Sequence, residues 1–413
     1  MYLPEIKSNI YYLGVNDRKK HLFENIVPEL YQNLAQLPFA VHGAEQGVAY
    51  NSYLILDKKT ALIDTVDIGM MPVFLQKLQT VLQGRTLDYI VVNHMEPDHA
   101  AGIEQVTKYY PDVIVVGNKK TLQFISYYFT GKFNTMEVAE GQEISLGEKK
   151  ISFIFAPMVH WPEVMLTYEH DTQTIFSADA FGCFGTLDGG CTDATLDMER
   201  YDEEYLRYYS NIVGKYGNPV QQLLKKITAI DISTVAPSHG PVLTQKESIQ
   251  KLVKLYKRLS LYEGETGVVI VYGSMYGNTE TMAEAIAGQL SLNGVQHIRI
   301  FDASKTHASY IIRDIFRYKG LIIGSPTYNS EIYPVVSSLI DKIAGYGVKN
   351  RLFSAFGSYT WADQASKKIA DFGQKMGWDT VYGPISTQGT LNECAFEEIA
   401  KMSKLFAIKL LQK

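Results

Sequence analysis

At residues 91 to 102 the chain reads "VVNHMEPDHAAG", in which an apolar stretch runs into four side chains that can bind metals. His94, Glu96 and Asp98 alternate, so in an extended loop their side chains point to the same side. His99 breaks the alternation and reaches the same volume only if the loop turns, which the proline between Glu96 and Asp98 favours. The stretch therefore predicts a buried strand that ends in a metal-binding loop.

Three further candidate ligands lie downstream, each at or just past the end of an apolar stretch: His160 in "MVHWPE", Asp179 in "FSADAFG" and His239 in "APSHGP". Seven ligands exceed what one tetrahedral zinc ion uses, but they suit two metal ions that share a carboxylate, for which Asp179 is the natural bridge. A carboxylate-rich set without thiolates favours iron or manganese over zinc. The competing interpretation is that these are separate surface or capping residues, which so many partners disfavour.

Length and composition limit the classes of protein that the chain can belong to. Its 413 residues suggest two or three domains. A hydrophobic content of 46%, a charged content of 20% and a net charge of -5 are typical of a soluble protein without a basic stripe for nucleic acid. No apolar run approaches the roughly 20 residues that span a bilayer, so we expect a cytoplasmic protein and no membrane partner.

The three cysteines, Cys183, Cys191 and Cys394, form no CxxC pair. The sequence therefore indicates neither a disulfide framework, a thiolate zinc site nor a rubredoxin-type iron centre. Free thiols in a reducing compartment are the expected state.

Up to about residue 262, apolar strand-like stretches alternate with amphipathic ones, which predicts a layered α/β domain. Two short strands are expected around the "LDKKT" turn within residues 47–65, and further strands at 87–93, 113–117, 151–157 and 173–182. The spacing predicts helices near 71–83, 100–110, 196–225 and 245–260.

The polar segment "EGETG", residues 263 to 267, is the best candidate for a domain boundary. After it the sequence alternates more regularly between strands and helices, and five stretches read as strands: "VVIVYG", "IRIFD", "GLIIGS", "RLFSAFG" and "TVYGPIS". Five strands with crossover helices predict a doubly wound parallel sheet.

The first of these strands opens "VVIVYGSMYGNTETMAEAIAG", residues 268 to 288, which predicts a strand, a tight loop and a helix. The segment lacks the GxxxxGK[ST] lysine and the GxGxxG spacing, so neither a nucleoside triphosphate nor a dinucleotide fits. Hydroxyls at Ser274 and Thr279, the Asn278 amide and the N–H groups at a helix N-terminus suit a phosphate monoester.

Two more loops follow strands of the same predicted sheet: "GSPTYNSEIYP" at 324–334 and "GSYTWADQA" at 357–365. Ligands of such sheets bind at the carboxyl ends of the strands, so the three loops are expected to converge on one crevice. Tyr328, Tyr359 and Trp361 are placed where they could contact an aromatic ligand, although core packing is the alternative for Tyr328.

The order HxExDH, His, Asp, His resembles the metallo-β-lactamase fold, whose hydrolases usually carry HxHxDH, and Glu96 in place of the second histidine resembles the flavodiiron proteins. The resemblance implies an αββα sandwich over residues 1–262 with two iron ions. One iron would bind His94, Glu96 and His160, the other would bind Asp98, His99 and His239, and Asp179 would bridge them. His99 is the ligand least firmly implied.

The resemblance also places His42 close to the irons, where it orients a ligand or donates a proton; a structural role is the equal alternative. We interpret the other histidines as structural or surface residues: His21, His170, His297 and His307.

The second half, residues 265–413, resembles flavodoxin, which implies a five-stranded doubly wound parallel sheet that binds FMN. The phosphate would lie in the first loop and the ring between the other two. The implied contacts are Ser274, Met275, Tyr276, Gly277, Asn278, Thr279, Pro326, Thr327, Tyr328, Asn329, Ser358, Tyr359, Thr360 and Trp361. Thr360 departs from the glycine common at that position in the family.

By this resemblance the protein is an oxidoreductase that reduces dioxygen to water, nitric oxide to nitrous oxide, or both. FMN would relay electrons from an external donor: rubredoxin, a reduced deazaflavin or a flavoprotein reductase. A head-to-tail homodimer or a dimer of dimers is implied, in which the partner's flavin serves the irons. The alternatives are a dinuclear zinc hydrolase with an accessory flavodoxin module, and a pure electron carrier with an inactive metal domain.

Overall fold

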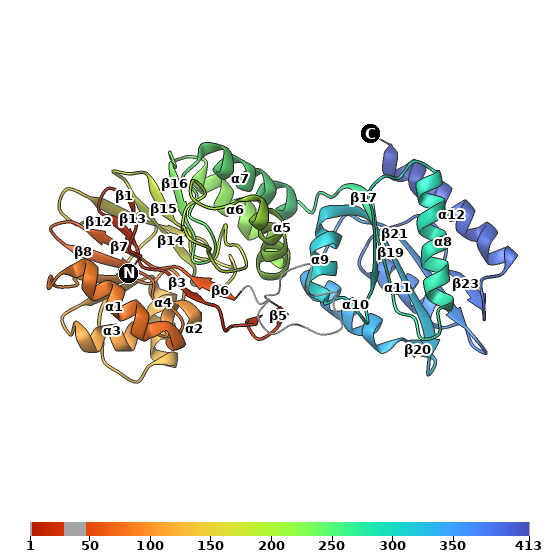
Figure 1. Ribbon diagram of the computed structural model, residues 1–413, viewed down its shortest axis with the longest axis horizontal. Coiled ribbons are helices and arrows are strands. Elements are labelled where there is room, and N and C mark those ends of the chain that lie inside the picture. The colour runs from red at the N-terminus through yellow and green to blue at the C-terminus, as the bar shows by residue number, and fades with distance from the viewer. Residues whose placement is uncertain (1, 29–46, 413) are drawn as a thin grey trace. The chain divides into compact units, whose positions relative to one another are not determined.

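The structure is a computed structural model that describes residues 2–28 and 47–412 (Figure 1). It divides into two compact units, the first of which ends at Lys257 while the second continues from Arg258. The domain limits expected from the sequence, 1–262 and 265–413, stay a prediction.

The first unit contains a seven-stranded sheet in the order β1-β2-β7-β8-β9-β10-β11. Strands β8 to β11 run parallel to one another, and β1, β2, β7 and β8 pair antiparallel. The strands are β1 (Glu5–Lys7), β2 (Ile10–Tyr12), β7 (Tyr53–Leu56), β8 (Thr60–Ile63), β9 (Tyr89–Val91), β10 (Ile114–Gly117) and β11 (Asn134–Glu137). β8 and β9 are buried along their whole length, as expected of strands covered on both faces.

The second sheet of this unit has the order β12-β13-β14-β15-β16. Its strands pair antiparallel except for β15 and β16, which are parallel. They are β12 (Glu143–Ser145), β13 (Lys150–Phe155), β14 (Met165–Glu169), β15 (Thr174–Phe176) and β16 (Thr234–Ala236). Two small ribbons complete the strands: β3 (Val15–Asp17) with β6 (Val48–Tyr50), and β4 (Leu22–Phe23) with β5 (Val27–Pro28).

Helices lie on the two outer sides of this pair of sheets (Figure 1). On one side lie α1 (Met71–Leu82), α2 (Pro97–Ala100), α3 (Ile103–Tyr109) and α4 (Lys119–Tyr128), and on the other α5 (Glu199–Tyr208), α6 (Gly217–Ile227) and α7 (Lys246–Ser260). In α1 the buried side chains Phe74, Leu78 and Val81 recur at helical spacing, which explains why this stretch is a helix. The predicted αββα sandwich is confirmed.

The helix expected over residues 196–225 is broken. Between α5 and α6 lie a π-helical turn, Tyr209–Val213, and a short 3₁₀ turn, Gly214–Tyr216. Gly214 and Gly217 have poor helix propensity, which weakens a continuous helix at this point. π turns of this kind are frequent near functional sites, and Tyr208, directly before the turn, is fully buried.

The second unit is a parallel sheet in the order β18-β17-β19-β21-β22. Its strands are β17 (Glu265–Tyr272), β18 (Ile298–Asp302), β19 (Tyr318–Tyr328), β21 (Leu352–Tyr359), β22 (Asp379–Thr380) and β23 (Ile385–Gln388), and β20 (Glu331–Ile332) adds a hairpin to β19. This is the flavodoxin-like order, with the switch point between β17 and β19. The predicted last strand "TVYGPIS" is two strands, β22 and β23, which both pair with β21, because Gly383 and Pro384 interrupt the ladder.

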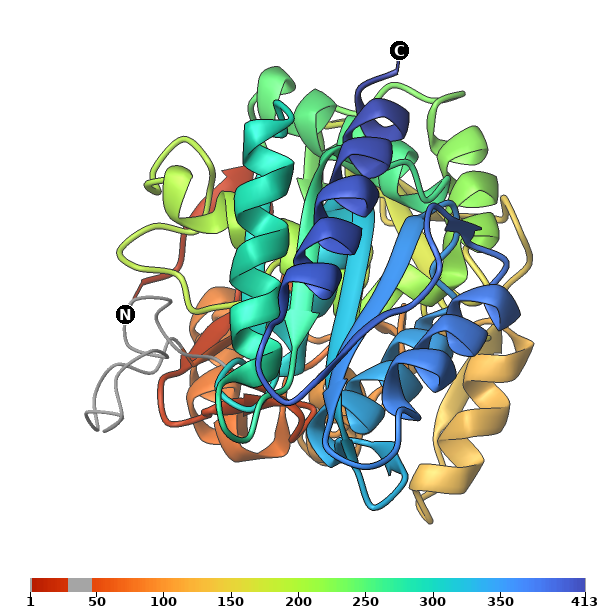
Figure 2. The same ribbon diagram turned by 90° about the vertical axis from the view of Figure 1, so that its right-hand side faces the viewer.

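The helices of this unit cover both faces of the sheet. α8 (Asn278–Leu292) and α12 (Glu393–Leu411) lie side by side over one face (Figures 1 and 2), where Ile286, Met402 and Phe406 pack into a buried core. α9 (Ala308–Arg317), α10 (Pro334–Tyr346) and α11 (Ala365–Lys375) complete the unit. No helix within residues 2–28 and 47–412 is both long and apolar enough to cross a membrane.

Candidate functional site

The loop after β9 delivers the first ligands, and it is not extended throughout. Glu96 caps the N-terminus of α2 with extended backbone, and the following proline is the first residue of that helix. Asp98 and His99 therefore lie on a helical turn, so the expectation of alternating side chains along one extended loop is wrong beyond Glu96. The turn directs Asp98 and His99 into a second group of ligands.

One group, the Glu96 cluster, consists of His94, Glu96, His160 and Asp179. The Nε2 atoms of His94 and His160 each lie 3.2 Å from Oε2 of Glu96. His160 comes from the loop between β13 and β14, and Asp179 follows β15. Strands from both sheets of the sandwich thus end at one point.

The other group, the Asp98 cluster, consists of Asp98, His99 and His239. Nε2 of His99 lies 3.4 Å from Oδ1 of Asp98, and Nε2 of His239 lies 3.3 Å from Oδ2 of Asp98. The two imidazole nitrogens face each other at 3.1 Å. His99 is thus turned toward the centre, although it is the ligand least firmly implied by the sequence.

Asp179 connects the two clusters. Its Oδ2 atom lies 2.9 Å from Nε2 of His160, and its Oδ1 atom lies 3.1 Å from Nε2 of His99. The carboxylate is fully buried. Each oxygen faces a different cluster, which is the geometry of a carboxylate that bridges two metal ions.

The carboxylates and histidines of the site shift one another's pKa values. Burial lowers the pKa of His94, but Glu163 and Glu96 outweigh it and raise the pKa to about 10. Burial also lowers the pKa of His160, but Asp179 and Glu96 outweigh it and raise the pKa to about 10. For His99, burial is outweighed by Asp98 and Asp179, which raise the pKa to about 9. Burial favours a neutral Asp179, yet the surrounding histidines bring its pKa well below the ordinary value.

The donor set fits two metal ions. The buried Oδ1 atoms of Asp98 and Asp179 accept no hydrogen bond from any described residue, and such atoms are costly unless a cation or a proton satisfies them. Four imidazoles and three carboxylates without a thiolate suit iron or manganese better than zinc. The seven residues predicted from the sequence therefore meet in one place that can hold a dinuclear centre.

Sequence reasoning missed several side chains around this centre. Oε1 of Glu163 lies 2.8 Å from Nδ1 of His94. Phe23 in the β4–β5 hairpin packs edge-on against His239, with ring centroids 4.9 Å apart, and Tyr208 lies 5.9 Å from the same ring. The Tyr208 hydroxyl is buried and has no hydrogen-bond partner among the described residues.

Glu24 follows Phe23 at the tip of the β4–β5 hairpin. Burial and the neighbouring Glu96 carboxylate raise the pKa of Glu24 to about 8, so it is mostly protonated at pH 7. No motif pointed to Glu24, because its hairpin is more than 60 residues from His94 in the sequence. Glu163 did carry a signal, since it stands three residues after His160 in the quoted segment "MVHWPE".

The other histidines that the structure describes lie outside both clusters. His42 lies outside the described residues. His170 contacts the Ser152 hydroxyl, His297 stacks on Tyr318 and His307 caps the N-terminus of α9, while His21 is exposed.

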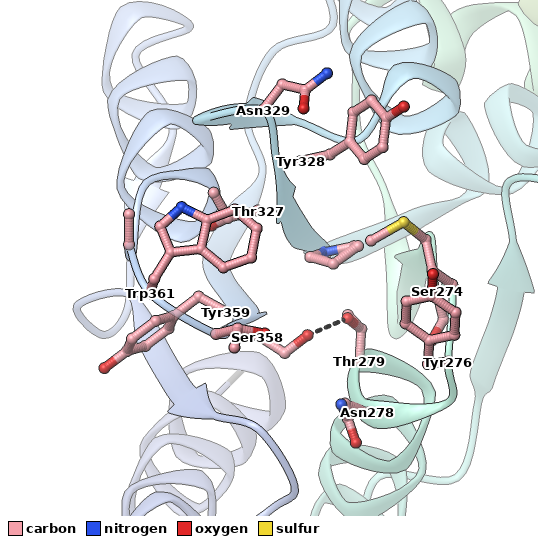
Figure 3. Close-up of a pocket in the computed structure, with 14 residues that line it drawn as sticks. Ser274, Tyr276, Asn278, Thr279, Thr327, Tyr328, Asn329, Ser358, Tyr359 and Trp361 are labelled. Carbon is pink, nitrogen blue, oxygen red and sulfur yellow. Dashed lines mark hydrogen bonds between the residues drawn. The ribbon is translucent and has the colours of Figure 1, made fainter.

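The second predicted site is an open cleft of about 300 Å³ at the carboxyl ends of β17, β19 and β21. Of the fourteen predicted residues all but Gly277 line it, and Ala362 is an additional lining residue. Tyr328 is 41% exposed, so core packing is not its role. Tyr276 and Trp361 are 88% and 82% exposed, and Figure 3 shows them on opposite sides of the cleft.

The floor of the cleft fits a phosphate monoester. Gly277 has a positive φ of 89° directly before α8, which places backbone N–H groups at the N-terminus of a 15-residue helix. The hydroxyls of Thr279 and Ser358 lie 2.8 Å apart between the aromatic walls (Figure 3). The hydroxyl and amide donors suit the phosphate of a flavin mononucleotide. The exposed aromatic side chains suit its ring.

A dinuclear histidine and carboxylate centre in a lactamase-like sandwich, joined to a flavodoxin-like crevice, defines a class of two-domain redox proteins. Comparisons with known proteins agree with it. Residues 48–240 match the model of the ODP family beta lactamase, and residues 270–401 match that of flavodoxin.

Relatives match nearly the whole chain. A nitric oxide reductase of Moorella thermoacetica is 34% identical over 336 residues, 81% of this chain and 82% of that protein. The anaerobic nitric oxide reductase flavorubredoxin of Vibrio vulnificus is 30% identical over 98% of this chain and 80% of its own length. The rubredoxin oxygen:oxidoreductase of Desulfovibrio gigas has the same fold, with a TM-score of 0.91, 24% identity and coverage of 99% and 98% of the two chains. The chain belongs to the flavodiiron family.

Proposed function

We propose that this protein reduces dioxygen to water, nitric oxide to nitrous oxide, or both, at a diiron centre supplied with electrons by FMN. The observation that carries the proposal is Asp179, whose two oxygens face the Glu96 cluster and the Asp98 cluster. The names of the relatives, nitric oxide reductases and a flavorubredoxin, support the same chemistry.

The seven residues of the two clusters would hold the iron ions, and the cleft lined by Thr279 and Trp361 would hold FMN. When bound there, iron would supply reducing chemistry toward a diatomic gas, and FMN would supply one-electron transfer. Five of the seven ligands are buried, whereas the Glu96 and Asp98 side chains are 15% and 18% exposed.

Both reactions consume protons, and two side chains beside the centre hold them. Glu24, with its pKa of about 8, retains a proton at neutral pH next to Glu96. Burial raises the pKa of the Tyr208 phenol well above its ordinary value, so this tyrosine, 5.9 Å from the His239 ring between centroids, can donate a hydrogen bond but keeps its proton. Glu24 is the proposed local proton source.

The electron donor is proposed to be an external protein or cofactor: rubredoxin, a reduced deazaflavin or a flavoprotein reductase. The exposed aromatic rim of the cleft, with Tyr276 and Trp361, leaves the flavin accessible to such a donor. Cys191 and Cys394 are free thiols in the described part of the chain, which supports a reducing compartment, and we propose the cytoplasm.

The assembly is proposed to be a head-to-tail homodimer or a dimer of dimers in which one subunit's flavin serves its partner's irons. Mixing an Asp179→Asn chain with a Thr279→Val chain tests this arrangement. With FMN limiting, each variant alone is expected to be nearly inactive, while mixed dimers pair an intact metal centre with an intact flavin site and recover gas consumption. Mixed dimers as inactive as their parents would contradict the exchange of electrons between subunits.

The function itself is tested on protein produced in iron-supplemented cells. The iron, zinc and FMN content per chain is measured first, followed by anaerobic assays of dioxygen and nitric oxide consumption with a chemical reductant. We expect two irons, one FMN and flavin-dependent consumption of at least one gas. Two zinc ions that iron cannot replace, together with hydrolysis of a thioester, lactam or phosphodiester, would instead establish the metallo-hydrolase.

A further inference from the structure

The two metal clusters differ in the groups that contact Nδ1 of their histidines, the ring nitrogen that faces away from the metal position. In the Glu96 cluster, Oε1 of Glu163 lies 2.8 Å from Nδ1 of His94 and also accepts the backbone N–H of Met95 at 2.9 Å. Because this oxygen is an acceptor, Nδ1 of His94 must be the donor. When the ring is neutral, as a metal ligand must be, its lone pair is therefore on Nε2, which points at the metal position.

The support from Glu163 is charged, buried and rigid. Glu163 is 1% exposed, and its Oε2 atom has no hydrogen-bond partner among the described residues, so little else competes for its charge. Its backbone carbonyl accepts a hydrogen bond from the side-chain amide of Asn118, which also caps α4. A carboxylate on the rear nitrogen makes the front nitrogen of an imidazole a stronger ligand.

The Asp98 cluster has weaker support. Nδ1 of His239 donates to the backbone carbonyl of Ala49 at 2.8 Å, which orients the ring without a charge. Nδ1 of His99 is buried and finds no partner within the described part of the chain. The buried Asp64 carboxylate interacts electrostatically with both His99 and His94, but among the described contacts no carboxylate accepts a hydrogen bond from Nδ1 of His99 or His239.

We propose that the two metal ions bind unequally and in order: the ion of the Glu96 cluster binds first and more tightly, because Glu163 strengthens His94, and the ion of the Asp98 cluster leaves first. This inference rests on the proposed diiron function. Since Asp179 offers one oxygen to each cluster, it does not favour either. Glu163 is a positioning residue in this scheme and touches neither metal nor substrate.

The test uses the full chain with FMN bound, freed of metal by a chelator and titrated anaerobically with Co²⁺, whose visible absorption reports each binding step. We expect two steps per chain. Glu163→Gln keeps the shape and one acceptor oxygen but removes the charge, and it should weaken the first step by about 10- to 100-fold while the second is unchanged. His99→Ala should abolish the second step only. Glu104→Gln, a half-exposed position on α3 outside both clusters, is the matched control and should change neither.

A second measurement needs no variant. Crystals of the wild-type protein grown with one equivalent of Co²⁺ per chain should give strong anomalous density at the Glu96 cluster and little at the Asp98 cluster. Equal density at both clusters, density mainly at the Asp98 cluster, or an unchanged first step in Glu163→Gln would overturn the proposal. Circular dichroism and FMN content identify a misfolded variant, in which case the crystals decide.

These outcomes are separate from a failure of the proposed function. A chain that binds two Co²⁺ ions without order remains compatible with a diiron enzyme and refutes only the role of Glu163. A chain that binds fewer than two ions refutes the diiron centre itself.

Discussion

The Oδ2 atom of Asp179 lies 2.9 Å from Nε2 of His160, at a point where both side chains are buried. The other oxygen of Asp179 faces His99 at 3.1 Å. A single carboxylate thus stands between histidines that come from the two sheets of the sandwich. It is the residue on which both metal positions depend.

Replacing Asp179 by asparagine should lower gas consumption by at least about 100-fold, because an amide is a poor bridge between two cations. FMN content should be unchanged, since the flavin cleft lies in the other unit. Nitric oxide and oxygen electrodes measure the gas consumption, and flavin absorbance measures the FMN content. Asp171→Asn, an exposed position in the same unit, is the control; a fully active Asp179→Asn would contradict the bridging role.

The flavin prediction concerns Thr279, whose hydroxyl is buried on the floor of the cleft. Thr279→Val keeps the shape but removes a hydrogen bond to a charged phosphate, which contributes about 1.5–3 kcal/mol, so FMN affinity should fall about 10- to 100-fold. Quenching of FMN fluorescence in a titration measures it. Thr281→Val, an exposed change on the same helix, should bind FMN normally. Equal affinity in both variants would place the phosphate elsewhere.

Metal binding should release protons at neutral pH. His94, His99 and His160 have pKa values of about 10, 9 and 10 in the metal-free protein, so all three are protonated at pH 7. Iron binds only neutral imidazole, so loading the centre should release about three protons, and affinity should weaken as the pH falls. A pH indicator in weakly buffered solution measures the release. Binding that is independent of pH between 6 and 9 would contradict this prediction.

The same pKa shifts predict how stability changes with pH in the metal-free protein. A histidine whose pKa is raised on folding stabilises the fold fully below its unfolded pKa of about 6.5, and that stabilisation is lost as the pH rises through the folded value. The metal-free first unit should therefore become less stable between pH 7 and 10. Thermal unfolding at several pH values, compared with the iron-loaded protein, detects the change; equal melting temperatures across this range would argue against it.

Arg351 is predicted to stabilise the second unit. Its buried guanidinium donates to the carbonyls of Ile315 and Phe316 at the end of α9 and to that of Tyr262. Arg351→Met leaves these acceptors buried without a donor and should cost about 3 kcal/mol of unfolding free energy. Urea denaturation measures the loss. Lys342→Met, which is exposed on α10, should cost little, and a similar effect of both substitutions would disprove the role of Arg351.

Local sequence patterns predicted much of this protein because they depend on the chain's own chemistry. The alternation of apolar strands and helices indicated both α/β units, and the loop chemistry around Ser274 and Thr279 predicted a phosphate site, whose residues line a cleft in the structure. The spacing from His94 to His99 and the isolated His160, Asp179 and His239 indicated a set of candidate ligands that the structure brings together.

Only the tertiary structure decided how these ligands divide and what surrounds them. Pro97 starts a helical turn that sends Asp98 and His99 to a second cluster, which a two-residue period could not foresee. Glu24 and Tyr208 reach the centre, and Glu163 stands behind His94, through contacts between segments far apart in the chain. A sequence pattern reports the conformation of neighbouring residues, whereas the distances that set metal geometry, proton retention and ligand strength arise only when separate strands end at the same place.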